Sequence, residues 1–218
     1  MVVAIKAYFE KLNIVYYRIE KTGSTSTAVW LRKHNGIMEQ LRGGPYPSNV
    51  KNLVTVRNPF PRLVSLYFNV YLTINNNENI SFEEYVNKLL NNTTLKKFEQ
   101  QCYQIKHLKF DFIIHLDKYE EGMRELAKYI KTDEPFLFKN KGTILYDSFL
   151  YNLPAYNIKA FDFVDRSDNT IMPADIYRNV HFPYWKLFYN DELIKKVLNI
   201  YEEDFNFFGF EKDFDKVN

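Results

Sequence analysis

The chain has 218 residues, of which 17% are aromatic, while only 7 are glycine and 8 are proline. This composition excludes a disordered chain, and the length fits one domain with a sizeable core, which we predict over residues 1–218. The net charge of +2 is too small for the dense basic surface of a nucleic-acid-binding protein, although it permits a local basic cleft for an anionic ligand.

The chain contains a single cysteine, Cys102, so it can form neither an intramolecular disulfide nor a cysteine-based metal site. We expect no bound metal. No apolar run reaches the roughly 18 residues that a membrane-spanning helix needs, and the N-terminal apolar run is too short for a signal peptide. We therefore expect a protein without a membrane segment that works in the cytoplasm.

The apolar pattern predicts strands that alternate with helices. Short runs of β-branched and aromatic residues indicate strands, and apolar residues at helical spacing indicate helices. This alternation favours parallel β-α units and an α/β fold whose sheet is covered by helices. The predicted elements, in chain order, are a strand at 13–19, a helix at 24–34, a strand at 52–56, helices at 59–72, 82–90 and 95–106, a strand at 110–116, a helix at 119–130, a short strand at 161–164, a short helix at 174–180 and a closing helix at 191–206.

The segment between the first predicted strand and helix has the features of an anion site. Gly23 permits close backbone approach, the following amides open a helix, and Lys21 adds a positive charge. Five of the six positions 22–27 carry hydroxyls. The lysine precedes the glycine, which departs from the G-x-x-x-x-G-K-[ST] pattern of ATPases and GTPases. The alternative is an ordinary helix cap with surplus serine and threonine.

A second candidate site follows the second predicted strand. Arg57 closes that strand, and Asn58 and Pro59 open a helix on which Ser65 lies about two turns further along. A guanidinium and a hydroxyl that converge can bind a phosphate monoester. The alternative is a structural ion pair of Arg57 with Ser65 as an incidental polar residue.

The two segments together resemble the donor-binding motifs of sulfotransferases that use 3′-phosphoadenosine-5′-phosphosulfate (PAPS). These segments are Lys-Thr-Gly-Ser-Thr-Ser from residue 21 and Arg-Asn-Pro-Phe-Pro-Arg-Leu-Val-Ser from residue 57. The likeness is to the carbohydrate branch, which includes the heparan sulfate 2-O- and 6-O-sulfotransferases. Residues 110–130 and 191–210 are also similar to that branch, whereas residues 135–180 match poorly. The resemblance implies a three-layer, P-loop-like α/β domain with a central parallel sheet flanked by helices.

This resemblance implies PAPS as co-substrate and adenosine 3′,5′-bisphosphate as product. Lys21 would also stabilise the charge on the oxygen that sulfur leaves. Arg57 and Ser65 would bind the 3′-phosphate, and Arg166 falls where related enzymes place a loop over the nucleotide. The residues implied for the 5′-phosphosulfate are Lys21, Thr22, Gly23, Ser24, Thr25 and Ser26.

Sulfuryl transfer also needs a base that removes the proton of an acceptor hydroxyl. Family members often carry it between the two donor motifs, where His34 and Glu39 are the strong candidates. His34 could instead complement a helix dipole, and Glu39 could be an exposed charge. Glu20, beside the lysine, could be a base or a surface charge. We interpret His115, in an apolar strand, as a core residue.

The sequence thus predicts an O-sulfotransferase with a hydroxyl acceptor, which we expect to be a saccharide. One alternative is a nucleotide-dependent phosphotransferase with an atypical phosphate loop, but ATP has no 3′-phosphate for Arg57 and Ser65. Another is a non-catalytic module that keeps the nucleotide pocket and lacks the base. The sequence gives neither the acceptor nor the oligomeric state.

Overall fold

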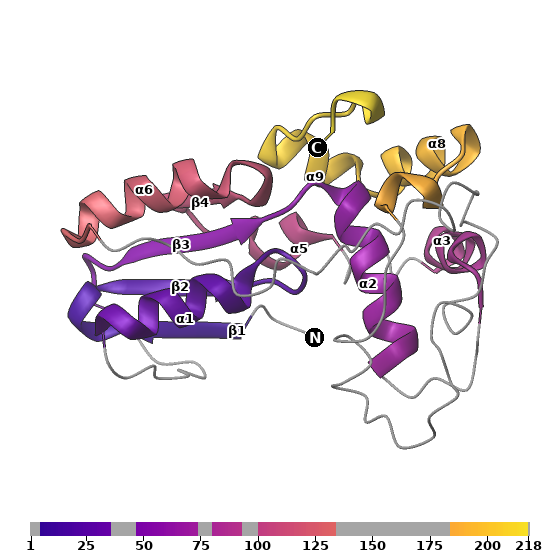
Figure 1. Cartoon of the computed structure of the whole chain (residues 1–218). Coiled ribbons are helices and arrows are strands. Elements are labelled where there is room, and N and C mark those ends of the chain that lie inside the picture. Colours follow the sequence, from indigo (N-terminus) through magenta and orange to yellow (C-terminus); the bar gives the residue numbers. More distant parts are fainter. Residues whose placement is uncertain (1–4, 36–46, 74–79, 93–99, 134–183, 218) are drawn as a thin grey trace, which may run out of the picture. The chain divides into compact units, whose positions relative to one another are not determined.

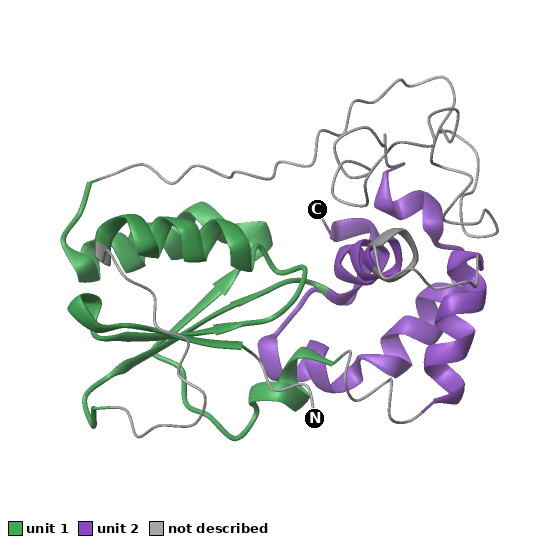
Figure 2. Ribbon diagram, turned by 90° about the horizontal axis from the view of Figure 1, so that it is seen from below, with its two compact units in different colours: residues 1–58, 100–140, 218 green, residues 59–99, 141–217 purple. Residues whose placement is uncertain are grey.

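The computed structural model describes residues 5–35, 47–73, 80–92, 100–133 and 184–217. The chain divides into two compact units (Figure 2). The first comprises residues 1–58, 100–140 and 218, and the second comprises residues 59–99 and 141–217. The expectation of a single domain over residues 1–218 stays a prediction.

The first unit contains a four-stranded sheet (Figure 1). Its strands are β1 (Ile5–Phe9), β2 (Ile14–Arg18), β3 (Lys51–Val56) and β4 (Phe112–His115), and they lie side by side in chain order. β2, β3 and β4 run parallel, whereas β1 pairs antiparallel with β2. The fold is therefore α/β with a mostly parallel sheet, and the three strands predicted in this part of the chain are confirmed.

β1 was not predicted, and it forms an edge of the sheet. A short 3-10 turn, η1 (Glu10–Leu12), joins it to β2, and Asn13 ends that turn in the left-handed conformation with φ of 53°. From Lys6 onward, β1 alternates between partly exposed and buried residues: Lys6 and Tyr8 are partly exposed, while Ala7 and Phe9 are buried. This is the pattern of a strand with one face on the core.

Two helices cover one face of this sheet, namely α1 (Ser24–Asn35) and α6 (Tyr119–Ile130). The short helix α5 (Gln101–Ile105) lies on the other side, as Figure 2 shows. The sheet is thus flanked by helices, as predicted. The buried core between the sheet and α1 and α6 consists of Ala7, Phe9, Ile14, Tyr16, Ala28, Trp30, Leu31, Leu53, Ile114, Tyr119, Met123, Leu126 and Ala127.

The second unit is helical in its described part. Its main helices are α2 (Pro59–Thr73), α3 (Phe82–Asn91), α8 (Asp191–Ile200) and α9 (Glu202–Phe208), with 3-10 turns η4 (Trp185–Phe188) and η5 (Phe214–Lys216). Its core is aromatic: the Phe60 ring packs on Tyr189, Phe205 and Phe214 at centroid distances of 5.4, 5.4 and 5.1 Å. The hydroxyl of Tyr189 also donates to the Phe60 carbonyl at 2.8 Å.

Two predicted helices differ from the structure. The closing helix predicted at 191–206 breaks at Tyr201, where φ is −108° and ψ is 21°, so that α8 and α9 are separate. Tyr201 and Phe205 are both buried there, and tertiary burial overrides the continuous helical pattern. Gly209 ends α9 with φ of 65°, as a glycine cap does. Of the helix predicted at 95–106, residues 95–99 lie outside the described residues, as do the elements predicted at 161–164 and 174–180.

Candidate functional site

The candidate site lies at one edge of the sheet, where β2, β3 and β4 all end. Tyr17 pairs with Val54, and Val56 pairs with His115, so the carboxyl ends of these parallel strands are adjacent. The first predicted phosphate segment follows β2, and Arg57 follows β3. Ligands of open α/β sheets bind at this edge.

The loop between β2 and α1 exposes a helix N-terminus. The amide of Thr27 donates to the Gly23 carbonyl at 3.2 Å, which is the first bond of the helix. The amides of Ser24, Thr25 and Ser26 therefore have no acceptor within α1, and the positive end of the helix dipole lies at them. A run of amides in this position suits an anion.

Gly23 is needed at this turn for two reasons. Its φ of 79° is in the left-handed region, which side chains other than glycine rarely adopt. A Cβ at this position would also lie 2.6 Å from Cδ1 of Leu116, which follows β4. The glycine thus lets the loop close onto the end of β4.

Thr22 fixes the loop to the sheet through a chain of hydroxyls. It donates to the Ile19 carbonyl at 2.9 Å and lies 3.1 Å from the Thr55 hydroxyl, which lies 2.6 Å from the Tyr16 hydroxyl. The Thr22 hydroxyl donates its proton to the Ile19 carbonyl, so it can only accept from Thr55. Thr55 can then accept from the Tyr16 hydroxyl. Burial raises the pKa of the Tyr16 hydroxyl, so that it stays a donor.

The hydroxyls of Thr22 and Thr27 have partners inside the protein. Thr22 and Thr27 are fully buried, and Thr27 lies 3.0 Å from the Tyr119 hydroxyl of α6. These two hydroxyls therefore help to hold the loop in place. Thr25 is exposed, while Ser24 and Ser26 are nearly covered.

Lys21 and Arg57 are brought together at this edge. Lys21 is half-buried, and burial lowers its pKa below the ordinary 10.5; the neighbouring Glu20 opposes this shift, and the charge of Arg57 adds to it. Lys21 also has a left-handed φ of 61°. Two cations that repel each other beside a helix N-terminus form a site that an anion would stabilise.

Ser65 belongs to the second unit. It is half-buried on α2, whereas Arg57 is half-buried in the first unit, and α2 begins at Pro59. Its neighbour Arg62 is only 2% exposed. Glu39 and Arg166 lie outside the described residues.

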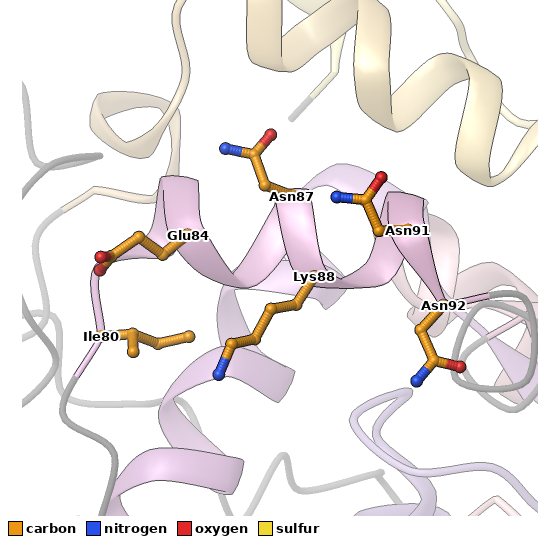
Figure 3. Close-up of a pocket in the computed structure, with 6 residues that line it drawn as sticks. All are labelled: Ile80, Glu84, Asn87, Lys88, Asn91 and Asn92. Atoms are coloured by element: carbon orange, nitrogen blue, oxygen red, sulfur yellow. The ribbon is translucent and has the colours of Figure 1, made fainter.

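A shallow pocket in the second unit contains none of the predicted site residues. Its lining comes from α3 and the residues beside it (Figure 3), and these residues are Ile80, Glu84, Asn87, Lys88, Asn91 and Asn92. In the described part of the chain, no cluster of three or more His, Cys, Asp or Glu could hold a metal ion.

A family model described as the sulfotransferase family matches residues 7–211 of the chain. The chain belongs to the sulfotransferase family. The match runs from β1 to just beyond α9, so it covers both phosphate segments and both compact units. No curated protein and no solved structure matches the chain.

A sulfotransferase holds an anionic donor and neutralises the phosphate that the sulfuryl group leaves. The edge of the sheet provides suitable groups, namely the amides at the start of α1 and the charges of Lys21 and Arg57. No helix among the described residues is long and apolar enough to cross a membrane.

The structure separates His34 from this edge. His34 lies in the last turn of α1, ten residues after Ser24, which corresponds to about 15 Å along the helix axis. Its ring packs on Trp30 of the preceding turn, with centroids 4.5 Å apart. This placement disfavours His34 as the base of the sulfotransferase.

His115 lies at the edge instead, which the sequence interpretation as a core residue did not anticipate. Among the described histidines, His34, His107 and His115, only His115 ends a strand of the sheet. It is half-buried, and burial lowers its pKa below 6.5, with Asp117 opposing and Lys118 adding to the shift. The signal available in the sequence was the position of His115 near the end of the strand predicted at 110–116.

Proposed function

We propose that the protein is a PAPS-dependent O-sulfotransferase. One observation supports the donor assignment most: Lys21 lies close enough to Arg57, at the carboxyl edge of the sheet and beside the amides that open α1, for the charge of Arg57 to lower its pKa. The 5′-phosphosulfate would lie against Lys21 and the segment from Gly23 to Ser26. Arg57 would bind the 3′-phosphate, and Ser65 is proposed as a second ligand on the sequence motif alone.

In the proposed reaction, the acceptor oxygen forms a bond to sulfur while the bond from sulfur to the donor phosphate oxygen breaks. The acceptor proton passes to a base, and the negative charge stays on adenosine 3′,5′-bisphosphate. Lys21 and the amides of α1 take up the charge that develops on the leaving oxygen, and this is the main electrostatic contribution that the protein makes.

Two residues are proposed as candidates for the base. Glu39 is a prediction from its position between the two motifs. His115 is favoured by its place at the end of β4 and by its lowered pKa, which leaves the imidazole neutral and able to accept a proton at neutral pH.

The donor assignment is tested by thermal stabilisation with adenosine 3′,5′-bisphosphate, ADP and AMP. A ligand at about 100 times its dissociation constant adds roughly 2.7 kcal/mol to the free energy of unfolding. We expect the 3′-phosphorylated ligand to stabilise most, and Arg57→Ala to abolish its advantage over AMP. Equal stabilisation by ADP would favour a phosphotransferase and contradict the proposal.

The saccharide acceptor is proposed from the resemblance of both motifs to the carbohydrate branch. It is tested by PAPS turnover with O-desulfated glycosaminoglycan oligosaccharides and with a tyrosine-containing peptide. We expect turnover with the saccharides alone. Turnover with the peptide alone would overturn the saccharide assignment, and donor binding without turnover on any acceptor would favour a non-catalytic module.

A further inference from the structure

The backbone of Arg57 is held by the side chain of Gln101, the first residue of α5. The Arg57 amide donates to Oε1 of Gln101 at 2.9 Å, and Nε2 of Gln101 donates to the Arg57 carbonyl at 2.8 Å. Gln101 is 0% exposed. The two residues are 44 positions apart in the chain and belong to the same compact unit.

This contact begins where the sheet stops. The last pair between β3 and β4 is Val56 with His115, so Arg57 lies one residue beyond the ladder. A carboxamide has the same donor and acceptor as a peptide group, and Gln101 therefore pairs with Arg57 as a neighbouring strand would. The backbone of β3 is thereby held in place for one residue beyond the sheet.

Fixing both polar groups of one residue also fixes the direction of its side chain. The amide and the carbonyl of Arg57 flank its Cα, so two short bonds to one buried side chain restrict the peptide groups on both sides. The direction of the Cα–Cβ bond follows from them. A guanidinium binds a phosphate in a defined fork geometry, so its affinity depends on that direction.

We propose that Gln101 is a positioning residue that aims Arg57 and thereby sets the preference of the enzyme for a 3′-phosphorylated donor. The inference rests on the proposed role of Arg57 in binding the 3′-phosphate. Gln101 contacts the backbone of Arg57 and acts through it. A merely structural role would instead weaken the whole protein and every ligand alike.

The test compares Gln101→Met with Gln104→Met, a matched change on the same helix. Methionine has nearly the shape of glutamine and neither hydrogen bond. The dissociation constants of adenosine 3′,5′-bisphosphate and of AMP are measured by calorimetry. We expect Gln101→Met to reduce the ratio between them about tenfold while the AMP affinity changes less than about twofold, and Gln104→Met to leave the ratio unchanged.

A double-mutant cycle with Arg57→Ala shows whether Gln101 acts through the arginine. We expect Gln101→Met to have no further effect on the ratio once Arg57 is removed. An unchanged ratio in Gln101→Met, an equal loss of both ligands, or the same loss with and without Arg57 would each overturn the inference. If the wild-type protein itself shows no preference for the 3′-phosphate, the proposed function fails instead, and the inference with it.

Gln101→Glu provides a second variant if Gln101→Met does not fold. When ionised, the introduced carboxyl can accept from the Arg57 amide but cannot donate to its carbonyl; when protonated, it can do both. We expect the ratio, taken relative to the wild type at each pH, to recover as the pH falls from about 8 to about 5. Comparison with the wild type removes the titration of Lys21 and of the phosphate, and a relative ratio that stays constant would contradict the proposal.

Discussion

Lys21 occupies an unfavourable position in the free protein. Its left-handed backbone costs about 1–2 kcal/mol for a residue with a Cβ, and burial together with Arg57 disfavours its charge. Residues in such conformations persist where the surrounding structure holds them, often at ligand sites. A bound phosphosulfate would compensate for the electrostatic part of this cost.

The lowered pKa of Lys21 predicts that ligand binding takes up a proton at alkaline pH. Below the free-state pKa the lysine is already charged, and no proton is exchanged. Above it, the anion raises the pKa again, so the affinity falls as the pH rises. Calorimetry of adenosine 3′,5′-bisphosphate in two buffers of different ionisation enthalpy measures this uptake. Lys21→Arg serves as the control, since a guanidinium does not titrate there, and uptake that persists in this variant would exclude Lys21 as its source.

The proposed base makes a prediction for the dependence of turnover on pH. If His115 is the base, kcat/KM of the wild type rises with pH through a value below 6.5 and is level at neutral pH, because burial lowers the pKa of the imidazole. His115→Asn should lower kcat about 100-fold or more and remove this limb. Glu39→Gln is the parallel variant, and if it alone removes the limb, Glu39 is the base.

At the scale of elements, the hydroxyls of Tyr16, Thr55 and Thr22 join β2, β3 and the loop before α1. All three residues are buried, so each of the three hydroxyls needs its hydrogen-bond partner inside the protein. The loop that carries Lys21 is therefore held by the sheet as well as by its own bond from Thr22 to Ile19.

Thr55→Val keeps the shape of the side chain and removes the central hydroxyl of this chain. We expect the free energy of unfolding to fall by about 1–3 kcal/mol, because two buried hydroxyls lose a partner. Denaturant unfolding measures the change. Thr25→Val, which removes an exposed hydroxyl from the first turn of α1, should change the stability by less than about 0.5 kcal/mol. Equal effects of the two variants would mean that the chain of hydroxyls does not stabilise the loop.

The sequence predicted the elements whose patterns are local. The apolar runs of β2, β3 and β4 and the periodicity of α6 were sufficient to place them. Properties that depend on distant residues were not predictable: Thr22 and Thr25 look alike in the sequence, and only the packing of Thr55 assigns the first to the scaffold. The contact of Gln101 with Arg57 joins residues 44 positions apart, and no local pattern indicates it.

At the scale of the whole molecule, the boundary between the two compact units falls inside the second phosphate motif. Arg57 and Asn58 belong to the first unit, and Pro59 and Ser65 belong to the second. The sulfotransferase family match spans both. A variant of Arg57 therefore changes only the first unit, and a variant of Ser65 changes only the second. The preference for a 3′-phosphate can be measured in both variants.

The order of the strands also determines how the site can be assembled during synthesis. Because β1, β2, β3 and β4 are neighbours in the order in which they are translated, each strand after β1 leaves the ribosome when its preceding neighbour in the sheet has already been made. The hydroxyls of Tyr16, Thr55 and Thr22 that tie the loop with Lys21 to β2 and β3 are complete once Thr55 has been made, whereas the contacts of this loop with Leu116 and Tyr119 form later. Gln101 emerges 44 residues after Arg57. We therefore expect a nascent chain to tie this loop to β2 and β3 first, to aim the arginine after α5 has been made, and to close the loop on Leu116 and Tyr119 last.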